Sequence, residues 1–396
     1  MWLAVALLAW AGGARAAGMA NSAESYYRRA FHEPDPQKRI ALLTRALAVN
    51  PNHLPSLRHR SLVYTSLDDK PRAFADLSRA AGLAPGDAAI THRAAALAEE
   101  LKRHAEAAKL YALTLAVQQK NVGVRARRID VLLKLLRVDE AVKEANLLVE
   151  QRPDLDLPYS VRADAYEWAG RHQDAIADLT RLIERRPRSA ARYYLARCIH
   201  YRAVGDGRRA LADAQKAIDE RGSTAFCFAA RGCSYEILGE HQKALADYQR
   251  AATLDTEKRY YAIWRCILLR KIGKRAQADR LIKTFLAKSV KDREGWITPV
   301  IRYLAGEMKE AEVFRLAKAP DPIKNREQLC EAYYYVGACH LAAGDLNKAE
   351  ALFKKCLALR VHNFYEHGFS IRDLRAVKAL REKKKAEAAG GPAEPQ

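Results

Sequence analysis

The sequence predicts an all-α solenoid, built from helix pairs that repeat about every 34 residues. Small residues recur at that period, prolines recur between the copies, and no stretch alternates with the period of two that a strand requires. In the copy "EHQKALADYQRAATLD" at 240–255, Ala244, Tyr248 and Ala251 share one helix face. The two alanines have short side chains, so a second helix can approach this face closely, and the pattern predicts such a contact.

The small residue at Ala244 recurs in most copies of the repeat. Its equivalents are Ala73, Ala107, Ala141, Ala175, Ala210, Ala278, Ala311 and Ala349. Upstream, Gly232 and Gly337 lie on a preceding helix, which Gly239 and Gly344 end. Each copy is therefore predicted to be a helix–turn–helix unit packed through small residues. A proline that starts the next copy is present at Pro51, Pro85, Pro153 and Pro187.

These positions resemble the tetratricopeptide repeat (TPR), whose helix pairs meet through small residues. The resemblance implies a right-handed superhelical solenoid of about ten TPR repeats, nine in residues 20–318 and the tenth in residues 330–363. The copies begin near Asn21, Leu54, Ala88, Val122, Asp156, Ala190, Ala225, Arg259, Asp292 and Cys330. The ninth copy runs into "APDPIKN", so residues 319–329 are predicted to be a linker.

The end of the chain differs from the repeats. Residues 364–386 are predicted to form a charged capping helix, because a terminal repeat needs a polar outer face. Residues 387–396 are rich in Gly and Pro and are expected to be a disordered tail.

The first 18 residues, "MWLAVALLAWAGGARAAG", are typical of a signal peptide with cleavage near Ala16. The apolar run is too short to span a bilayer. No cysteine precedes Cys198, so acylation as a lipoprotein is not expected. The sequence thus predicts a periplasmic or secreted protein with no transmembrane anchor. The alternative is translation from Met19, which would give a cytoplasmic protein with every repeat intact.

All seven cysteines lie in the second half, at Cys198, Cys227, Cys233, Cys266, Cys330, Cys339 and Cys356. An odd number cannot all pair within one chain. Cys266 takes the place of Gly232 and Cys356 that of Ala251, which favours thiols that fill helix contacts. One disulfide is the alternative. No C-x-x-C or H-x-x-x-H pair is present, so no metal is expected.

The chain is strongly basic, with 68 Lys and Arg against 47 Asp and Glu and a formal net charge of +21. The excess is greatest in residues 181–209. The basic patch predicted there consists of Arg181, Arg185, Arg186, Arg188, Arg192, Arg197, Arg208 and Arg209. A patch of this kind is either a solvated helix surface or a field that attracts an anionic partner.

Sequence patterns that announce catalysis are absent: there is no G-x-S-x-G, no H-E-x-x-H and no G-x-x-x-x-G-K. The eleven histidines are scattered singly. The sequence therefore predicts a protein that is not an enzyme, with no cofactor and no catalytic residues.

Binding is the activity that a solenoid offers, because its first helices line an extended concave surface. The TPR resemblance implies that the groove binds protein or peptide segments. Its predicted lining residues are Tyr194, Arg202, Phe226, Tyr260, Arg270, Trp296, Tyr303 and Tyr334.

Three stretches of the C-terminal quarter, "RYLAGE" at 302–307 and the segments 328–358 and 361–374, resemble NlpI-type periplasmic TPR adaptors. This resemblance implies a non-catalytic adaptor. Together with the signal-like N-terminal segment, it predicts an exported scaffold for cell-envelope protein assemblies, for which nucleic acid is not an expected partner. Two other hypotheses remain: an intracellular basic adaptor associated with nucleic acid, translated from Met19, and a TPR subunit of an enzyme.

Overall fold

The computed structural model describes residues 22–186, 190–221, 224–256, 259–288, 295–362 and 364–388. Within these ranges it contains 21 α-helices and no strand, so the all-α prediction is confirmed. The predicted signal peptide and most of the predicted tail lie outside the described residues. The chain divides into two compact units, Met1–Pro153 and Asp154–Gln396.

The first unit consists of four antiparallel helix pairs. Its helices are α2 (Ala23–His32), α3 (Pro36–Val49), α4 (Leu54–Ser66), α5 (Lys70–Leu83), α6 (Ala88–Glu100), α7 (His104–Val117), α8 (Val122–Lys134) and α9 (Val138–Gln151). Each helix packs on its neighbours in sequence, as in a stack of repeats.

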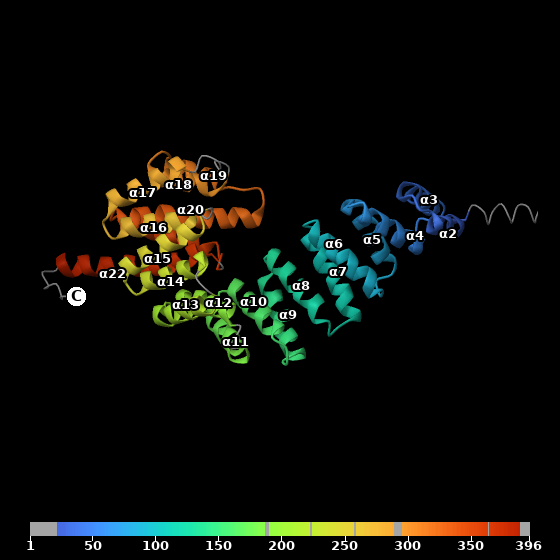
Figure 1. Ribbon diagram of the computed structural model, residues 1–396, viewed down its shortest axis with the longest axis horizontal. Coiled ribbons are helices and arrows are strands. Elements are labelled where there is room, and N and C mark those ends of the chain that lie inside the picture. The colour runs from blue at the N-terminus through green and yellow to red at the C-terminus, as the bar shows by residue number, and fades with distance from the viewer. Residues whose placement is uncertain are drawn as a thin grey trace, which may run out of the picture. The chain divides into compact units, whose positions relative to one another are not determined.

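The second unit holds six more pairs and a final helix (Figure 1). Its helices are α10 (Leu157–Trp168), α11 (His172–Arg185), α12 (Ala191–Val204), α13 (Gly207–Arg221), α14 (Ala225–Ile237), α15 (His241–Leu254), α16 (Tyr260–Lys271), α17 (Arg275–Lys288), α18 (Ile297–Ala305), α19 (Glu310–Leu316), α20 (Pro322–Ala342), α21 (Leu346–Ala358) and α22 (Tyr365–Ala388). Ten pairs and a closing helix agree with the repeat count predicted from the sequence. None of the helices in the described ranges is both long enough and apolar enough to cross a bilayer.

Local sequence signals account for many of the helix ends. The side chains of Asp35, Asn121 and Thr224 accept hydrogen bonds from backbone N–H groups in the first turns of α3, α8 and α14. Gly205 and Gly306 end α12 and α18 in the left-handed conformation, with φ of 86° and 83°. The matching turns of the first unit use Asp68, Lys102 and Leu136 in the same conformation.

Small residues make the helix contacts that the repeat register predicts. Ala73, Ala107, Ala141, Ala175, Ala210, Ala244, Ala251, Ala278 and Ala349 are all fully buried. A Cβ at Gly232 would lie 2.9 Å from the ring of Tyr248, and one at Gly337 would lie 2.8 Å from the ring of Phe353. Glycine in the first helix therefore makes room for an aromatic ring of the second.

The ninth repeat departs from this register in its second helix. Ala311, expected in the helix contact, is exposed, and Val313 and Ala317 are buried instead. In the seventh repeat one residue separates Gly239 from the start of α15, whereas three separate Gly306 from the start of α19. The longer turn moves the buried position by two residues, which is why the prediction of Ala311 was wrong.

Most of the predicted linker is helical. Residues 322–329 form the first two turns of α20, because Asp321 caps the helix and Pro322 occupies its first turn, where no N–H donor is needed. The tenth repeat therefore has a first helix that is 21 residues long.

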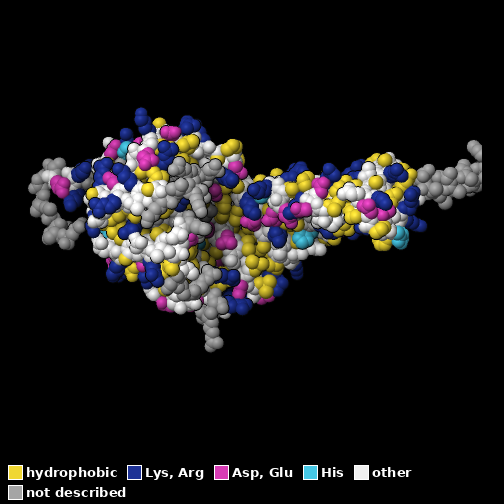
Figure 2. Space-filling view, turned by 45° about the horizontal axis from the view of Figure 1, so that its top comes forward, with side chains coloured by type: hydrophobic (Ala, Val, Ile, Leu, Met, Phe, Trp, Pro, Cys, Tyr) yellow, Lys and Arg dark blue, Asp and Glu magenta, His cyan; other side chains and the backbone are white. Residues whose placement is uncertain are grey.

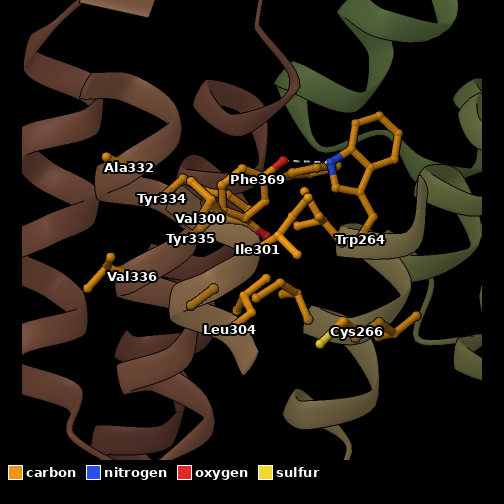
Figure 3. Packing of buried hydrophobic residues seen from close by; sticks show 14 of the residues in the cluster. Trp264, Cys266, Val300, Ile301, Leu304, Ala332, Tyr334, Tyr335, Val336 and Phe369 are labelled. Atoms are coloured by element: carbon orange, nitrogen blue, oxygen red, sulfur yellow. Dashed lines mark hydrogen bonds between the residues drawn. The ribbon is translucent and has the colours of Figure 1, made fainter. Parts of the chain in front are cut away.

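The core of the second unit gathers aromatic side chains from helices far apart in sequence. In Figure 3, Trp264 of α16, Ile301 of α18, Tyr335 of α20 and Phe369 of α22 meet in one cluster. The closing helix α22 packs against α12, α20 and α21. It is thus part of the core of the second unit as well as a cap on the last repeat.

Candidate functional site

The first helices of the second unit hold the chain's own C-terminal helix. The guanidinium of Arg202 lies 4.2 Å from the ring centroid of Tyr365, and Phe226 contacts the same ring edge to face. Trp264 stacks on Tyr365 at 4.8 Å. Two predicted groove residues, Arg202 and Phe226, therefore face α22.

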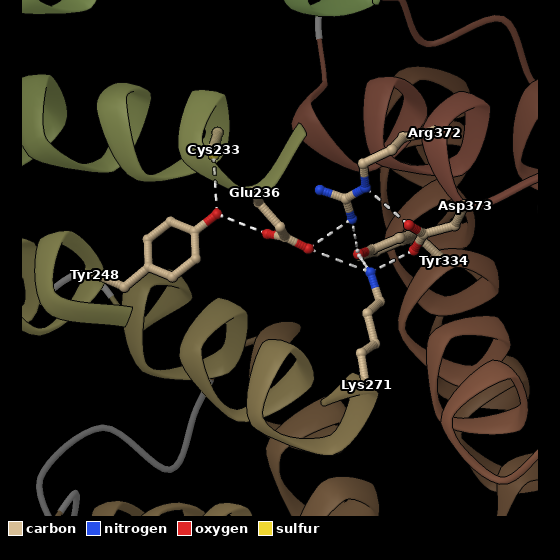
Figure 4. A network of polar contacts seen from close by, with 7 residues as sticks. All are labelled: Cys233, Glu236, Tyr248, Lys271, Tyr334, Arg372 and Asp373. Atoms are coloured by element: carbon tan, nitrogen blue, oxygen red, sulfur yellow. Dashed lines mark hydrogen bonds and ion pairs between the residues drawn. The ribbon is translucent and has the colours of Figure 1, made fainter. Parts of the chain in front are cut away.

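A buried ion-pair network fastens α22 to α14 and α16 (Figure 4). Lys271 Nζ lies 2.5 Å from Asp373, and Arg372 lies 2.9 Å from Glu236 and 2.8 Å from Asp373. Tyr248 donates a hydrogen bond to Glu236 at 2.9 Å. Burial alone would raise the pKa of Asp373, but the two cations hold it below its usual value.

A second buried network joins α16 and α20 with the start of α22. Tyr260 and Trp296 donate hydrogen bonds to Glu331 at 3.0 and 2.7 Å. Trp264 donates to Tyr335, whose hydroxyl donates to Glu366. Removal from water and the nearby Glu366 raise the pKa of Glu331 to about 8.

An open pocket of about 600 Å³ lies between α16, α17, α18 and α20. Arg270 and Tyr303, both predicted groove residues, line it together with Arg275, Lys283 and Asp279. Arg270 donates to Asp279 at 2.6 Å and to the Leu304 carbonyl at 2.5 Å, while its Nε is buried without a hydrogen-bond acceptor. Leu304, Met308 and Ala342 supply an apolar wall.

The remaining predicted groove residues are dispersed. Trp296 and Tyr260 belong to the Glu331 network, Tyr334 is 2 % exposed in the core, and Tyr194 is 7 % exposed and packs under Arg197. Of the eight residues, Arg270 and Tyr303 line the pocket of about 600 Å³. Partner binding at the eight residues stays a prediction.

The arginines of the predicted basic patch mostly contact the chain itself. Arg181 and Arg192 lie over the rings of Tyr159 and Tyr193, at 4.5 and 4.4 Å. Arg185 and Arg186 pair with Asp156, and Arg209 with Asp206. Arg208 is exposed, and Arg188 lies outside the described residues. On the face in Figure 2, basic side chains lie scattered among acidic ones rather than in one field.

A bidentate arginine–aspartate pair joins the two helices of four repeats. In each pair, arginine Nε and Nη2 donate to the aspartate sixteen residues later, at 2.7 to 2.9 Å. The pairs are Arg60–Asp76, Arg162–Asp178, Arg197–Asp213 and Arg231–Asp247. These contacts give part of the arginine excess a structural role.

Glu236 escaped the sequence prediction although a signal for it existed. Arg202, Glu236 and Arg270 recur at intervals of 34 residues and so share one position in the repeat. The predicted groove set contains only aromatic and basic residues, and so it omits the acidic Glu236.

Four histidines also gather where α11, α12 and the start of α22 meet. His172 Nδ1 and His200 Nδ1 lie 3.1 Å apart, and the rings of His362 and His367 lie 4.4 Å apart. Burial lowers the pKa of His200 to about 3 and that of His362 to about 4. In the described ranges, no group of three or more His, Cys, Asp and Glu side chains is arranged to hold a metal ion.

Comparison with known proteins gives a family-model match for one repeat. Residues 227–258, which span most of α14 and α15, match the family model described as tetratricopeptide repeat. The solved structures that resemble the chain include a tetratricopeptide repeat protein from Parabacteroides merdae, at 18 % identity over 62 % of this chain and 98 % of that chain, with a TM-score of 0.41. TTC0263, a TPR protein of Thermus thermophilus, is 21 % identical over 46 % of this chain and 98 % of its own, with a TM-score of 0.38.

Proposed function

We propose that this repeat protein is a non-catalytic scaffold that binds a segment of a partner protein in the pocket between α16 and α20. The observation that carries the proposal is a contrast between two parts of the second unit. The closing helix α22 contacts α12, α14 and α16, which are the first helices of their repeats, whereas Arg270 and Tyr303 border an open pocket of about 600 Å³. A pocket of that volume with an apolar wall and a few polar groups has the character of a ligand site.

The charge of the pocket favours an acidic segment. Arg270, Arg275 and Lys283 line it against the single carboxylate of Asp279. Asp279 is shared by Arg270 and Arg275, at 2.6 and 4.0 Å. Lys283 is exposed, and Arg275 has 82 % of its side chain accessible to solvent, so both can meet a carboxylate of the partner. The predicted basic patch is a weaker candidate because six of its eight arginines are already paired or stacked.

We expect the double reversal Arg275→Glu and Lys283→Glu to weaken binding of a fluorescein-labelled peptide of alternating Glu and Leu by about tenfold or more. Fluorescence anisotropy measures the affinity. The matched control is Lys383→Glu with Lys384→Glu, which makes the same charge change on the exposed end of α22. Binding by the unaltered chain should also weaken as salt rises, since screening acts over about 8 Å at physiological ionic strength.

Equal affinity of the two double variants would show that net charge alone attracts the peptide, and the pocket would then not be the site. Equal binding of a Lys/Leu peptide would contradict the preference for acidic segments.

We further propose that the scaffold is exported and acts on cell-envelope protein assemblies, as the resemblance to NlpI-type adaptors implies. Intact-mass analysis of the protein from its native cells should give a chain that begins at or near Ala17. A chain that begins at Met1 would contradict export, and one that begins at Met19 would support the intracellular alternative.

A further inference from the structure

Two thiols of the last repeat lie in direct contact. Cys330 Sγ on α20 and Cys356 Sγ on α21 are 3.2 Å apart, and both residues are fully buried. Each of the other five cysteines has a different neighbour: a hydroxyl for Cys198, Cys227 and Cys233, the Ala278 carbonyl for Cys266, and the Arg270 guanidinium for Cys339. The pair Cys330 and Cys356 is therefore distinct among the seven thiols.

The repeat itself brings these two positions together. The residues with the same separation of 26 in the sixth and seventh repeats are Ala191 with Ala217 and Ala225 with Ala251, all buried. These two repeats thus carry a small buried residue both at the start of the first helix and at the end of the second. The tenth repeat carries a thiol at each of the two equivalent positions, and there the thiols are in contact.

We propose that Cys330 and Cys356 form a disulfide when the chain folds in the presence of a disulfide oxidant. The sulfur atoms need to approach by only about 1.2 Å to reach the ~2.05 Å of an S–S bond. In thiol–disulfide exchange, one cysteine thiolate attacks the disulfide of the oxidant, forms a mixed disulfide and releases one thiolate of the oxidant. The second cysteine thiolate then attacks the cysteine sulfur of the mixed disulfide and expels the oxidant's other thiolate, so the two cysteines lose two protons and two electrons and glutathione disulfide becomes two glutathione thiols.

The cross-link would fasten the C-terminal closure of the second unit. Cys356 Sγ also lies 3.8 Å from the carbonyl of Glu366, in the first turn of α22. A bond between α20 and α21 at this point would restrain the two helices on which α22 packs. The inference is independent of which partner the pocket binds.

The test refolds the full chain in a buffer of oxidised and reduced glutathione and counts free thiols with a thiol reagent in denaturant. We expect the seven thiols to fall to five. Tryptic mapping without reduction should link the peptide 356–360 to the peptide 327–348, which contains both Cys330 and Cys339. Cys339→Ala should keep the linked peptides, and Cys330→Ala should lose them.

A stability readout separates a cross-link from simple packing. The oxidised chain should melt at a higher temperature than the same chain reduced with dithiothreitol, and this difference should vanish in the double variant Cys330→Ala with Cys356→Ala. That variant places at these positions the alanines that the sixth and seventh repeats already hold, so it is expected to fold. Seven free thiols after refolding, or a link through Cys339, would overturn the proposal.

Discussion

Replacing Asp373 by alanine is expected to lower the free energy of unfolding of the second unit by about 3 to 5 kcal/mol. The variant would leave Lys271 and Arg372, whose side chains are only 13 and 18 % exposed, facing one carboxylate, that of Glu236. Removing one member of a buried ion network costs this much because the remaining charges have lost their hydration and keep too few partners. The expected loss is therefore larger than that of the ion pair itself in water.

Tryptophan fluorescence during urea unfolding measures this loss selectively. Every tryptophan beyond the predicted signal peptide, at Trp168, Trp264 and Trp296, belongs to the second unit. The matched control is Glu382→Ala, which removes a carboxylate from the exposed pair with Lys378 on the same helix and should change stability by less than about 1 kcal/mol. Equal losses for the two variants would mean that the network contributes nothing beyond a surface pair.

The periodic part of this structure could be predicted from the sequence. A helix contact that recurs every 34 residues requires small residues at equivalent positions of the copies. Ala244 and Gly232 could therefore be assigned to the helix contact from the sequence. The same reasoning failed at Ala311, because two added residues in one turn are invisible to a fixed period. The start of α20 was missed because "APDP" reads as a break, although Asp321 and Pro322 are a helix start.

The filled groove was not predictable in this way. Lys271 and Asp373 lie 102 residues apart, and their contact occurs once in the chain. A unique contact between a repeat and a closing helix has no period to reveal it. The TPR resemblance implies that the first helices line a groove, but it carries no information about which segment of the chain packs against them.

The last prediction concerns pH: the second unit should lose about 2 kcal/mol of stability through Glu331 as pH rises from 6 to 8. Burial and the nearby Glu366 raise the pKa of Glu331 to about 8 in the folded chain, against an ordinary value of 4.5. The folded state therefore binds the proton more tightly than the unfolded state. The stabilising contribution is fully present below pH 4.5 and is lost as pH rises through 8, the reverse of an ordinary salt-bridged carboxylate.

Glu331→Gln should flatten this profile between pH 6 and 8. The amide keeps the shape of the protonated acid, accepting a hydrogen bond from Trp296 and donating one to Tyr260. The buried histidines have a depressed pKa, so the folded chain gains stability through them as pH rises through about 6.5. This gain is the same in both chains, so the difference between the two profiles reports Glu331. The window also lies below the ordinary ionisation of cysteine and tyrosine. Glu167, whose pKa burial raises to about 7, contributes equally to both chains.

Because Trp264 and Trp296 hydrogen-bond to the groups of this network, urea unfolding followed by tryptophan fluorescence at each pH reports the stability of the network directly. The control Glu382→Gln should keep the wild-type profile, and parallel profiles for Glu331→Gln and wild type would show that Glu331 is ionised in the folded chain throughout this range.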